Sequence, residues 1–74
     1  NYVKQVVNEA INMLSEEHRT VIVLRDIQGF SYEEIAKITK CPEGTVKSRI
    51  NRARHALKDI LSTKKELFNE DYVK

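Results

Sequence analysis

A run of basic and amide side chains in the second half of the chain has the composition of a polyanion-binding surface. Its basic members, with no acidic residue among them, are Lys47, Arg49, Arg52, Arg54 and Lys58. Ser48 and Asn51 lie within the same run. Arginine or lysine can donate to guanine O6 and N7, asparagine can pair with adenine, and further cations can neutralise phosphates. The run therefore favours recognition of a nucleic acid, and a solvated helix face is the alternative for a basic run taken alone.

The same run separates into two faces when positions from 46 onward are placed on an α-helix at about 100° per residue. The apolar face comprises Val46, Ile50, Ala53, Leu57, Ile60 and Leu61. The opposite, polar face comprises Lys47, Ser48, Asn51, Arg52 and His55. Arg49 and Arg54 fall on the borders between the two faces. A buried face opposite hydrogen-bonding groups that cations flank is what a helix in the DNA major groove requires.

We expect the helix with this polar face to be the second helix of a helix-turn-helix. Ser31 and Glu34 form a Ser-x-x-Glu capping box, which predicts the start of a short helix. That helix is expected to bury Ile35, Ala36 and Ile38. Cys41 and Pro42 then end it, because proline disfavours helical geometry in the preceding residue yet fits the first turn of the next helix. A longer basic helix is predicted from about Pro42 to Leu61.

Two further helices are predicted ahead of this motif. Apolar residues recur at three- and four-residue spacing from Val3 to Leu14, and Ser15 can cap a second helix that ends at Gly29. The predicted fold class is all-α: a four-helix domain, residues 1–61, with a C-terminal helix-turn-helix and without winged elements. Residues 62–74 are predicted to form a C-terminal tail, either a short helix or disordered.

Length and composition exclude several classes of function. A chain of 74 residues holds one domain with a thin core, and its single cysteine, Cys41, excludes an internal disulfide framework. His18 and His55 lack other ligands at metal spacing, and no Gly-rich phosphate loop or nucleophile motif is present. No window reaches the roughly 18 apolar residues of a membrane span. We expect a binding module of the reducing cytoplasm, not an enzyme, with no cofactor, metal or membrane contact.

The net charge of +2 conceals an uneven distribution. Positions 1–46 hold five basic and seven acidic residues, whereas positions 47–74 hold eight basic and four acidic ones. The first part therefore carries −2 and the second +4. This asymmetry predicts that a polyanion partner is bound by the second part of the chain.

Three stretches together resemble region four of bacterial RNA polymerase sigma factors, and most of all the extracytoplasmic-function group. They are LSEEHR at 14–19, GFSYEEIA at 29–36 and CPEGTVKSRINRAR at 41–54. The resemblance covers Leu14 to about Leu61. It implies a four-helix domain that recognises the −35 promoter element, and a chain that lacks the domain which opens the −10 element.

The resemblance also assigns roles to individual residues. Base-reading positions of the family match Arg25, Lys47, Ser48, Asn51 and Arg52. Its phosphate-contacting positions match Tyr32, Thr45, Arg49 and Arg54. Two positions depart from some relatives, because Asn51 stands where an aromatic residue can occur and Lys47 is often arginine. Since lysine is a point charge rather than a bidentate fork, these differences bear on the −35 sequence that is read.

The partners implied are promoter DNA, core RNA polymerase through its β-subunit flap, and an anti-sigma factor, with this chain acting as a monomer. Two other readings remain open. The chain can be a protein-interaction module, bound by the flap or by an anti-sigma factor, or a stand-alone dimeric helix-turn-helix repressor. A dimeric repressor needs two half-sites one helical turn apart, whereas a sigma domain binds one site.

Overall fold

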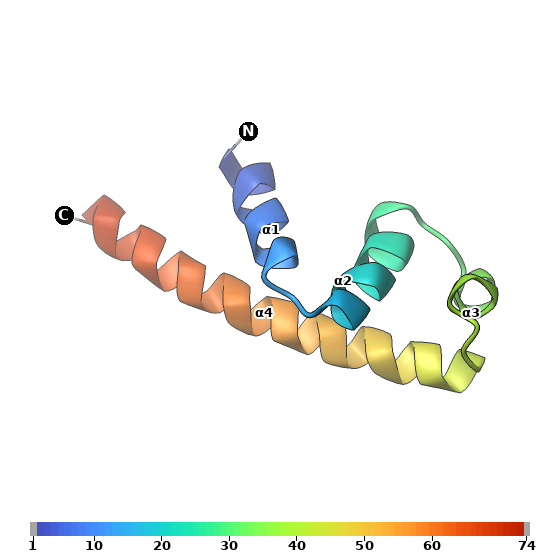
Figure 1. The fold of residues 1–74 in the computed structure, drawn as a ribbon. Helices are drawn as coiled ribbons and strands as arrows, with labels where there is room; N and C mark the ends of the chain where they lie inside the picture. Colours follow the sequence, from blue (N-terminus) through green and yellow to red (C-terminus); the bar gives the residue numbers. More distant parts are fainter. Residues whose placement is uncertain (1, 74) are drawn as a thin grey trace.

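The computed structural model describes the backbone of residues 2–73 and the side chains of residues 2–63. The helices are α1 (Tyr2–Asn12), α2 (Glu16–Ile22), α3 (Tyr32–Thr39) and α4 (Glu43–Val73), and a π-helical segment, Val23–Ile27, continues α2. The described residues contain no strand, so the predicted all-α class with four helices is confirmed. In Figure 1, α1, α2 and α3 lie along the same side of the long α4, and each of them contacts it.

Two serines begin α2 and α3 as the sequence predicts. Ser15 has an extended backbone, and its Oγ accepts a hydrogen bond from the His18 N–H at 3.3 Å. At α3 both halves of the capping box are present. The Ser31 N–H donates to Glu34 Oε1 at 2.9 Å, and the Glu34 N–H donates to Ser31 Oγ at 3.1 Å. These contacts satisfy backbone N–H groups that the first turn of a helix leaves without partners.

The core is formed where the other three helices cover the apolar face of α4. Its fully buried or nearly buried members are Ala10, Ile11, Leu14, Val21, Ile22, Ile35, Val46, Ile50 and Ala53. Val46, Ile50 and Ala53 are therefore buried as expected, while Leu57, Ile60 and Leu61 are partly buried. The apolar face predicted from the helical period is therefore the face of α4 that packs in the core.

One core prediction on α3 is wrong. Ile35 is completely buried and Ala36 is partly buried, but the side chain of Ile38 is 51% exposed. The short α3 packs on α4 and on the π-helical segment, and these neighbours cover one side of it. Ile38 lies three residues beyond Ile35 on the helix, but within the part of the chain whose side chains are described no element covers it.

The fourth helix does not end at Leu61, because α4 continues to Val73. Residues 62–73 contain neither proline nor glycine, so no residue interrupts the i to i−4 hydrogen bonds of the backbone. Whether Leu67, Phe68 and Tyr72 fold back on the core concerns side chains outside the described residues. The division of the chain at residue 61 remains a proposal.

The end of the second helix differs from a regular α-helix. Val23–Ile27 is π-helical, so that backbone hydrogen bonds join residues five rather than four positions apart. The Gln28 N–H, for example, donates to the Val23 carbonyl at 2.9 Å. Gly29 follows with a φ of 77°, the left-handed conformation expected after a helix end. The Phe30 N–H then closes the turn on the Leu24 carbonyl at 2.9 Å. Single π-turns within helices are frequent at functional sites.

Lys40 ends α3 in the left-handed conformation, with a φ of 58° and a ψ of 40°. Left-handed geometry costs a residue with a Cβ roughly 1–2 kcal/mol that glycine avoids, while glycine adds about 0.4–1 kcal/mol of unfolded-state entropy. We expect Lys40→Gly to raise the free energy of unfolding by up to about 1 kcal/mol. Urea denaturation followed by circular dichroism measures this change. Lys37→Gly within α3 is the matched control and should lower the same quantity by about 1 kcal/mol.

The capping box makes the start of α3 sensitive to acid. The hydrogen bonds from the Ser31 backbone and side chain lower the pKa of the Glu34 carboxyl below its ordinary value. A lowered folded-state pKa gives stability that is present above the unfolded pKa, about 4.3, and is lost as the pH falls. We therefore expect denaturation midpoints of the wild-type chain to fall more between pH 6 and about pH 3 than those of Glu34→Gln, which keeps the box but does not titrate. Equal falls in the two chains would contradict this.

Candidate nucleic-acid interface

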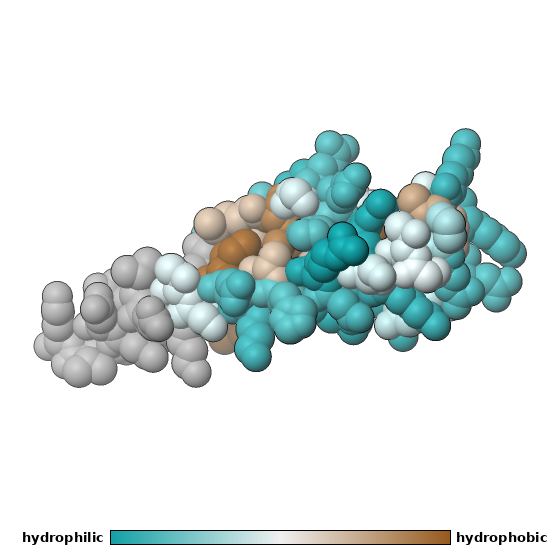
Figure 2. Space-filling view, turned by 90° about the horizontal axis from the view of Figure 1, so that it is seen from below, coloured by the Kyte–Doolittle hydropathy of each residue, from teal (hydrophilic) through white to brown (hydrophobic). Residues whose placement is uncertain are grey.

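The N-terminal half of α4 presents one polar face to solvent. Lys47, Ser48, Asn51 and Arg52 are all exposed there, and Thr45 is exposed at the start of the helix. Val46, Ile50 and Ala53, which alternate with them in sequence, have no exposed surface. Figure 2, seen from the α4 side, shows mostly hydrophilic atoms over this half of the molecule and hydrophobic atoms nearer the grey tail. Four of the five predicted base-reading residues therefore share one exposed surface.

The fifth, Arg25, belongs to the π-helical segment and approaches the same aromatic ring as Lys47 of α4. Its Nη1 donates to the Phe30 carbonyl at 2.9 Å, and its guanidinium Cζ lies 4.9 Å from the centre of the Tyr32 ring. Lys47 Nζ lies 5.8 Å from the same ring centre. Both distances are within the roughly 6 Å over which a cation is attracted by an aromatic face. Three residues predicted from separate stretches thus form one cluster, which we call the Tyr32 cluster (Arg25, Tyr32 and Lys47).

Arg54, predicted to contact phosphate, is engaged by a carboxylate. Its Nε and Nη2 donate to the two oxygens of Asp26 at 3.1 and 2.6 Å, a two-pronged pair that joins α4 to the π-helical segment. The hydrogen bond to Asp26 is the main cause that raises the pKa of Arg54, and the Tyr32 hydroxyl adds to it. The two side chains are 44% and 37% exposed, so the pair contributes at most about 1 kcal/mol. In the free chain Arg54 therefore joins α4 to the π-helical segment, and its contact with a DNA phosphate remains a prediction.

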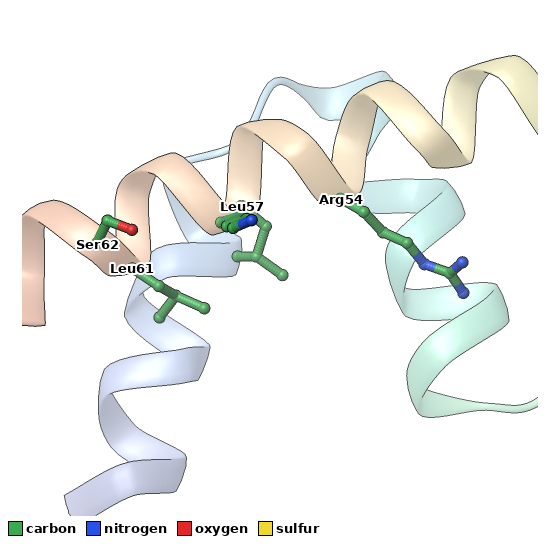
Figure 3. A pocket seen from close by; sticks show the side chains of 5 residues that line it. Arg54, Leu57, Leu61 and Ser62 are labelled. Carbon is green, nitrogen blue, oxygen red and sulfur yellow. The ribbon is translucent and has the colours of Figure 1, made fainter.

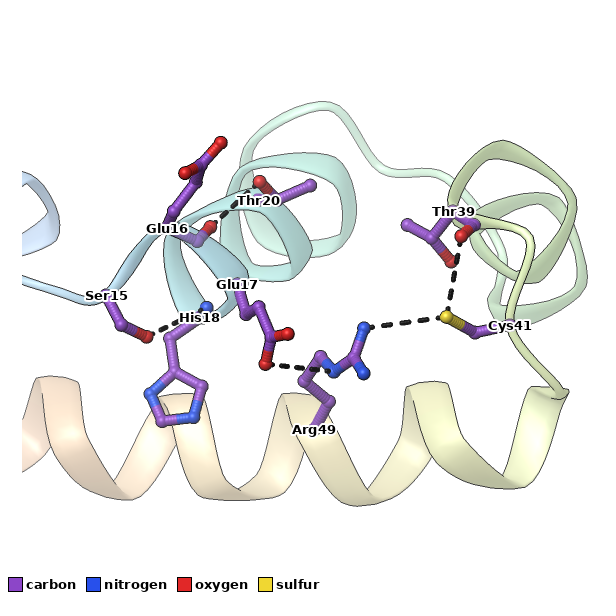
Figure 4. A network of polar contacts seen from close by, with 8 residues as sticks. All are labelled: Ser15, Glu16, Glu17, His18, Thr20, Thr39, Cys41 and Arg49. Atoms are coloured by element: carbon purple, nitrogen blue, oxygen red, sulfur yellow. Dashed lines mark hydrogen bonds and ion pairs between the residues drawn. The ribbon is translucent and has the colours of Figure 1, made fainter.

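Arg49 also has partners within the chain, as Figure 4 shows. Its Nε lies 3.9 Å from Glu17 Oε2, and its Nη1 donates to Cys41 Sγ at 3.6 Å. The Cys41 thiol in turn donates to the Thr39 carbonyl at 3.4 Å. Cys41 is partly rather than fully buried, and its small side chain leaves room for the Arg49 guanidinium that contacts it. Arg49 consequently links α2, the turn after α3 and α4.

A shallow polar groove of about 260 Å³ lies beside the exposed face of α4. It is lined by Glu17, His18, Gly44, Thr45, Ser48, Arg49 and Arg52. The sequence pattern does not connect Glu17 or His18 with the polar face, nor Asp26 with Arg54. Asp26 and Arg54 are 28 positions apart, and no periodicity or motif links residues at that distance. Only the packing of α2 and of the π-helical segment against α4 reveals these neighbours.

A second hollow, of about 290 Å³, lies farther along α4 and is mainly apolar (Figure 3). Leu57 and Leu61 supply its floor, with Arg54, Lys58 and Ser62 around them. Among the described residues, no group of three or more histidine, cysteine, aspartate or glutamate side chains is placed to hold a metal ion. No helix in the same part of the chain combines the length and apolar character of a transmembrane segment.

Comparison with known proteins agrees with this geometry. Residues 4–57 match the family model described as Sigma-70, region 4. The chain is 54% identical over 54 residues to the ECF RNA polymerase sigma-E factors of Escherichia coli (strain K12) and Salmonella typhimurium (strain LT2), covering 73% of this chain and 28% of each relative. It is 46% identical over 59 residues to the RNA polymerase sigma-H factor of Pseudomonas aeruginosa, covering 80% and 31%. The chain thus spans less than a third of the length of these relatives.

Proposed function

Because this chain belongs to the sigma-70 region 4 family, we propose that it is the domain of an extracytoplasmic-function sigma factor that recognises the −35 promoter element. Four predicted base-reading residues lie exposed on the N-terminal half of α4, where Val46, Ile50 and Ala53 on its other side have no exposed surface, and this observation carries the proposal. A helix with that division can enter the major groove while its apolar face stays on the domain.

The helix-turn-helix of α3 and α4 suggests how the contacts divide. We assign base reading to Arg25, Lys47, Ser48, Asn51 and Arg52. We assign phosphate contacts to Tyr32, Thr45, Arg49 and Arg54. For Arg54 this requires a phosphate to share or replace its contacts with Asp26. An arginine already held in a fork by a carboxylate is aligned for a phosphate oxygen, which has similar geometry.

The remaining parts of the proposal concern partners. The chain acts as a binding domain without a catalytic step, as a monomer, where RNA polymerase works in the cytoplasm. It docks on core RNA polymerase through the β-subunit flap, and an anti-sigma factor covers the same surfaces. The apolar hollow over Leu57 and Leu61 favours a second candidate function, a protein-interaction module, because a helix of a partner can place apolar side chains there.

Selection of bound duplexes from a random pool tests the proposal. We expect the 74-residue chain to enrich one asymmetric site, and sedimentation of the complex to give one chain per duplex. A palindromic site bound by two chains would favour a dimeric repressor instead. Recovery of no preferred sequence would overturn base recognition and leave the protein-interaction module as the better function.

Salt dependence provides an independent prediction for the basic face. Each lysine or arginine that neutralises a phosphate releases counterions, so the logarithm of the binding constant should fall linearly with that of the salt concentration, by about 0.9 per phosphate. Fluorescence anisotropy titrations between about 50 and 200 mM salt measure the slope. We expect Arg49→Gln to reduce the slope by about one, whereas Lys4→Gln on α1 should leave it unchanged. A wild-type slope near zero would contradict the electrostatic role of positions 47–58.

A further inference from the structure

The Tyr32 cluster points to a role for its aromatic ring beyond a phosphate contact. The ring belongs to the first residue of α3, while the two cations that approach it come from the π-helical segment and from α4. Arg25 lies 4.9 Å and Lys47 5.8 Å from the ring centre. Tyr32 is thus the contact at which the three elements that carry base-reading and phosphate-contacting residues meet.

The charges around this ring explain why it is needed. Arg25, Lys47 and Arg54 approach Tyr32, and within the described part of the chain the carboxylate of Asp26 pairs with Arg54. Like charges held close together repel each other, and long cationic side chains lose conformational freedom when they are fixed. The negative face of an aromatic ring offsets both costs without forming a salt bridge, so the donor groups of the cations stay available for bases.

The π-helical segment accounts for the approach of Arg25. The extra residue in this turn changes the direction of the side chains that follow, relative to a regular α-helix. Arg25 is held against the ring by its own hydrogen bond to the Phe30 carbonyl at 2.9 Å. The adjacent Asp26 reaches Arg54 on α4. One irregular turn therefore directs consecutive side chains to the two ends of the same site.

We infer that Tyr32 is a positioning residue that determines base specificity, because its ring holds Lys47 and Arg25 in the orientation in which they read bases. This inference rests on the proposed function and deepens it. Groups held in place before binding lose less freedom when the complex forms, and a wrong base then leaves a fixed donor without a partner. A ring that acted only by donating its hydroxyl to a phosphate would strengthen binding equally for every sequence.

The test compares variants on the duplex obtained by selection and on its single-base substitutions. Lys47→Ala, Arg25→Ala and Arg52→Ala first identify the base pairs that each cation reads. We expect Tyr32→Leu to lower the matched-to-mismatched affinity ratio roughly three- to tenfold at the base pairs assigned to Lys47 and Arg25, and to preserve the ratio at the base pair assigned to Arg52. Tyr32→Phe keeps the ring and should keep all the ratios, even where the lost hydroxyl weakens binding to every duplex.

An equal loss on every duplex with Tyr32→Leu, or loss of the ratios with Tyr32→Phe, would overturn the inference. Nuclear magnetic resonance of the free wild-type chain gives a measurement that does not depend on the stability of a variant. The methylene protons next to Lys47 Nζ and to the Arg25 guanidinium should resonate upfield of their random-coil positions if these cationic groups stay at the ring in solution, and random-coil values would also overturn it. Failure of the wild-type chain to prefer any duplex would instead contradict the proposed function, while the resonance positions would still decide the geometry.

Discussion

Replacement of Ile50 by alanine is expected to remove about 2–5 kcal/mol from the free energy of unfolding. Ile50 has no exposed surface and lies on the face of α4 that the other three helices cover. Removing its outer carbons loses apolar burial and leaves a cavity, because neighbouring helices relax only partly. At about 0.05–0.15 kcal/mol per residue, a chain of this length has a total stability of roughly 4–11 kcal/mol. This single change should therefore remove a large part of it.

Urea denaturation followed by circular dichroism at 222 nm measures the loss, with Ile38→Ala as the matched control. Ile38 has the same side chain and also lies in a helix, but it is 51% exposed. Its replacement should change the free energy of unfolding by no more than about 0.5 kcal/mol. Similar losses for the two variants would mean that α4 is not held by the core described above.

The features that the sequence predicts are those set by residues close together in the chain. The capping box needs only Ser31 and Glu34, three positions apart, and the buried face of α4 follows from the helical period. The turn after the second helix follows from Gly29, the residue that best tolerates positive φ. Each of these features can be predicted because its physical cause lies within one or two helical turns of the chain.

The features that escape prediction arise where one element meets another. The π-helical segment contains no proline or glycine from which the sequence could predict it. Lys40 adopts the left-handed conformation, which a residue with a Cβ disfavours. The Asp26–Arg54 pair and the Arg49 contacts join residues that are brought together only by the packing of α2, the π-helical segment and the turn after α3 on α4. These irregular features lie beside the proposed DNA-binding face, where a fold tolerates local cost for the sake of function.

Replacement of Arg52 by alanine is expected to weaken binding to the selected duplex by about 1–3 kcal/mol and to relax base preference at one position. Arg52 is exposed on the polar face of α4, beside Ser48 in the polar groove. Among residues 2–63, no hydrogen bond or ion pair engages its guanidinium, which distinguishes it from Arg49 and Arg54. Its donors are consequently available to a base edge. Anisotropy titrations on matched and mismatched duplexes measure both effects.

Two further variants separate base reading from charge. Lys4→Ala also removes one positive charge, but from α1 and away from the polar face, and it should leave both the base preference and the salt dependence unchanged. Arg52→Lys keeps the charge on α4 and loses the planar fork that can bind guanine O6 and N7 together. If Arg52 reads a base, the lysine variant should resemble alanine in its relaxed preference and the wild type in its salt dependence. If Arg52 contacts only phosphate, the lysine variant should keep the preference, and the alanine variant should lose affinity equally on every sequence.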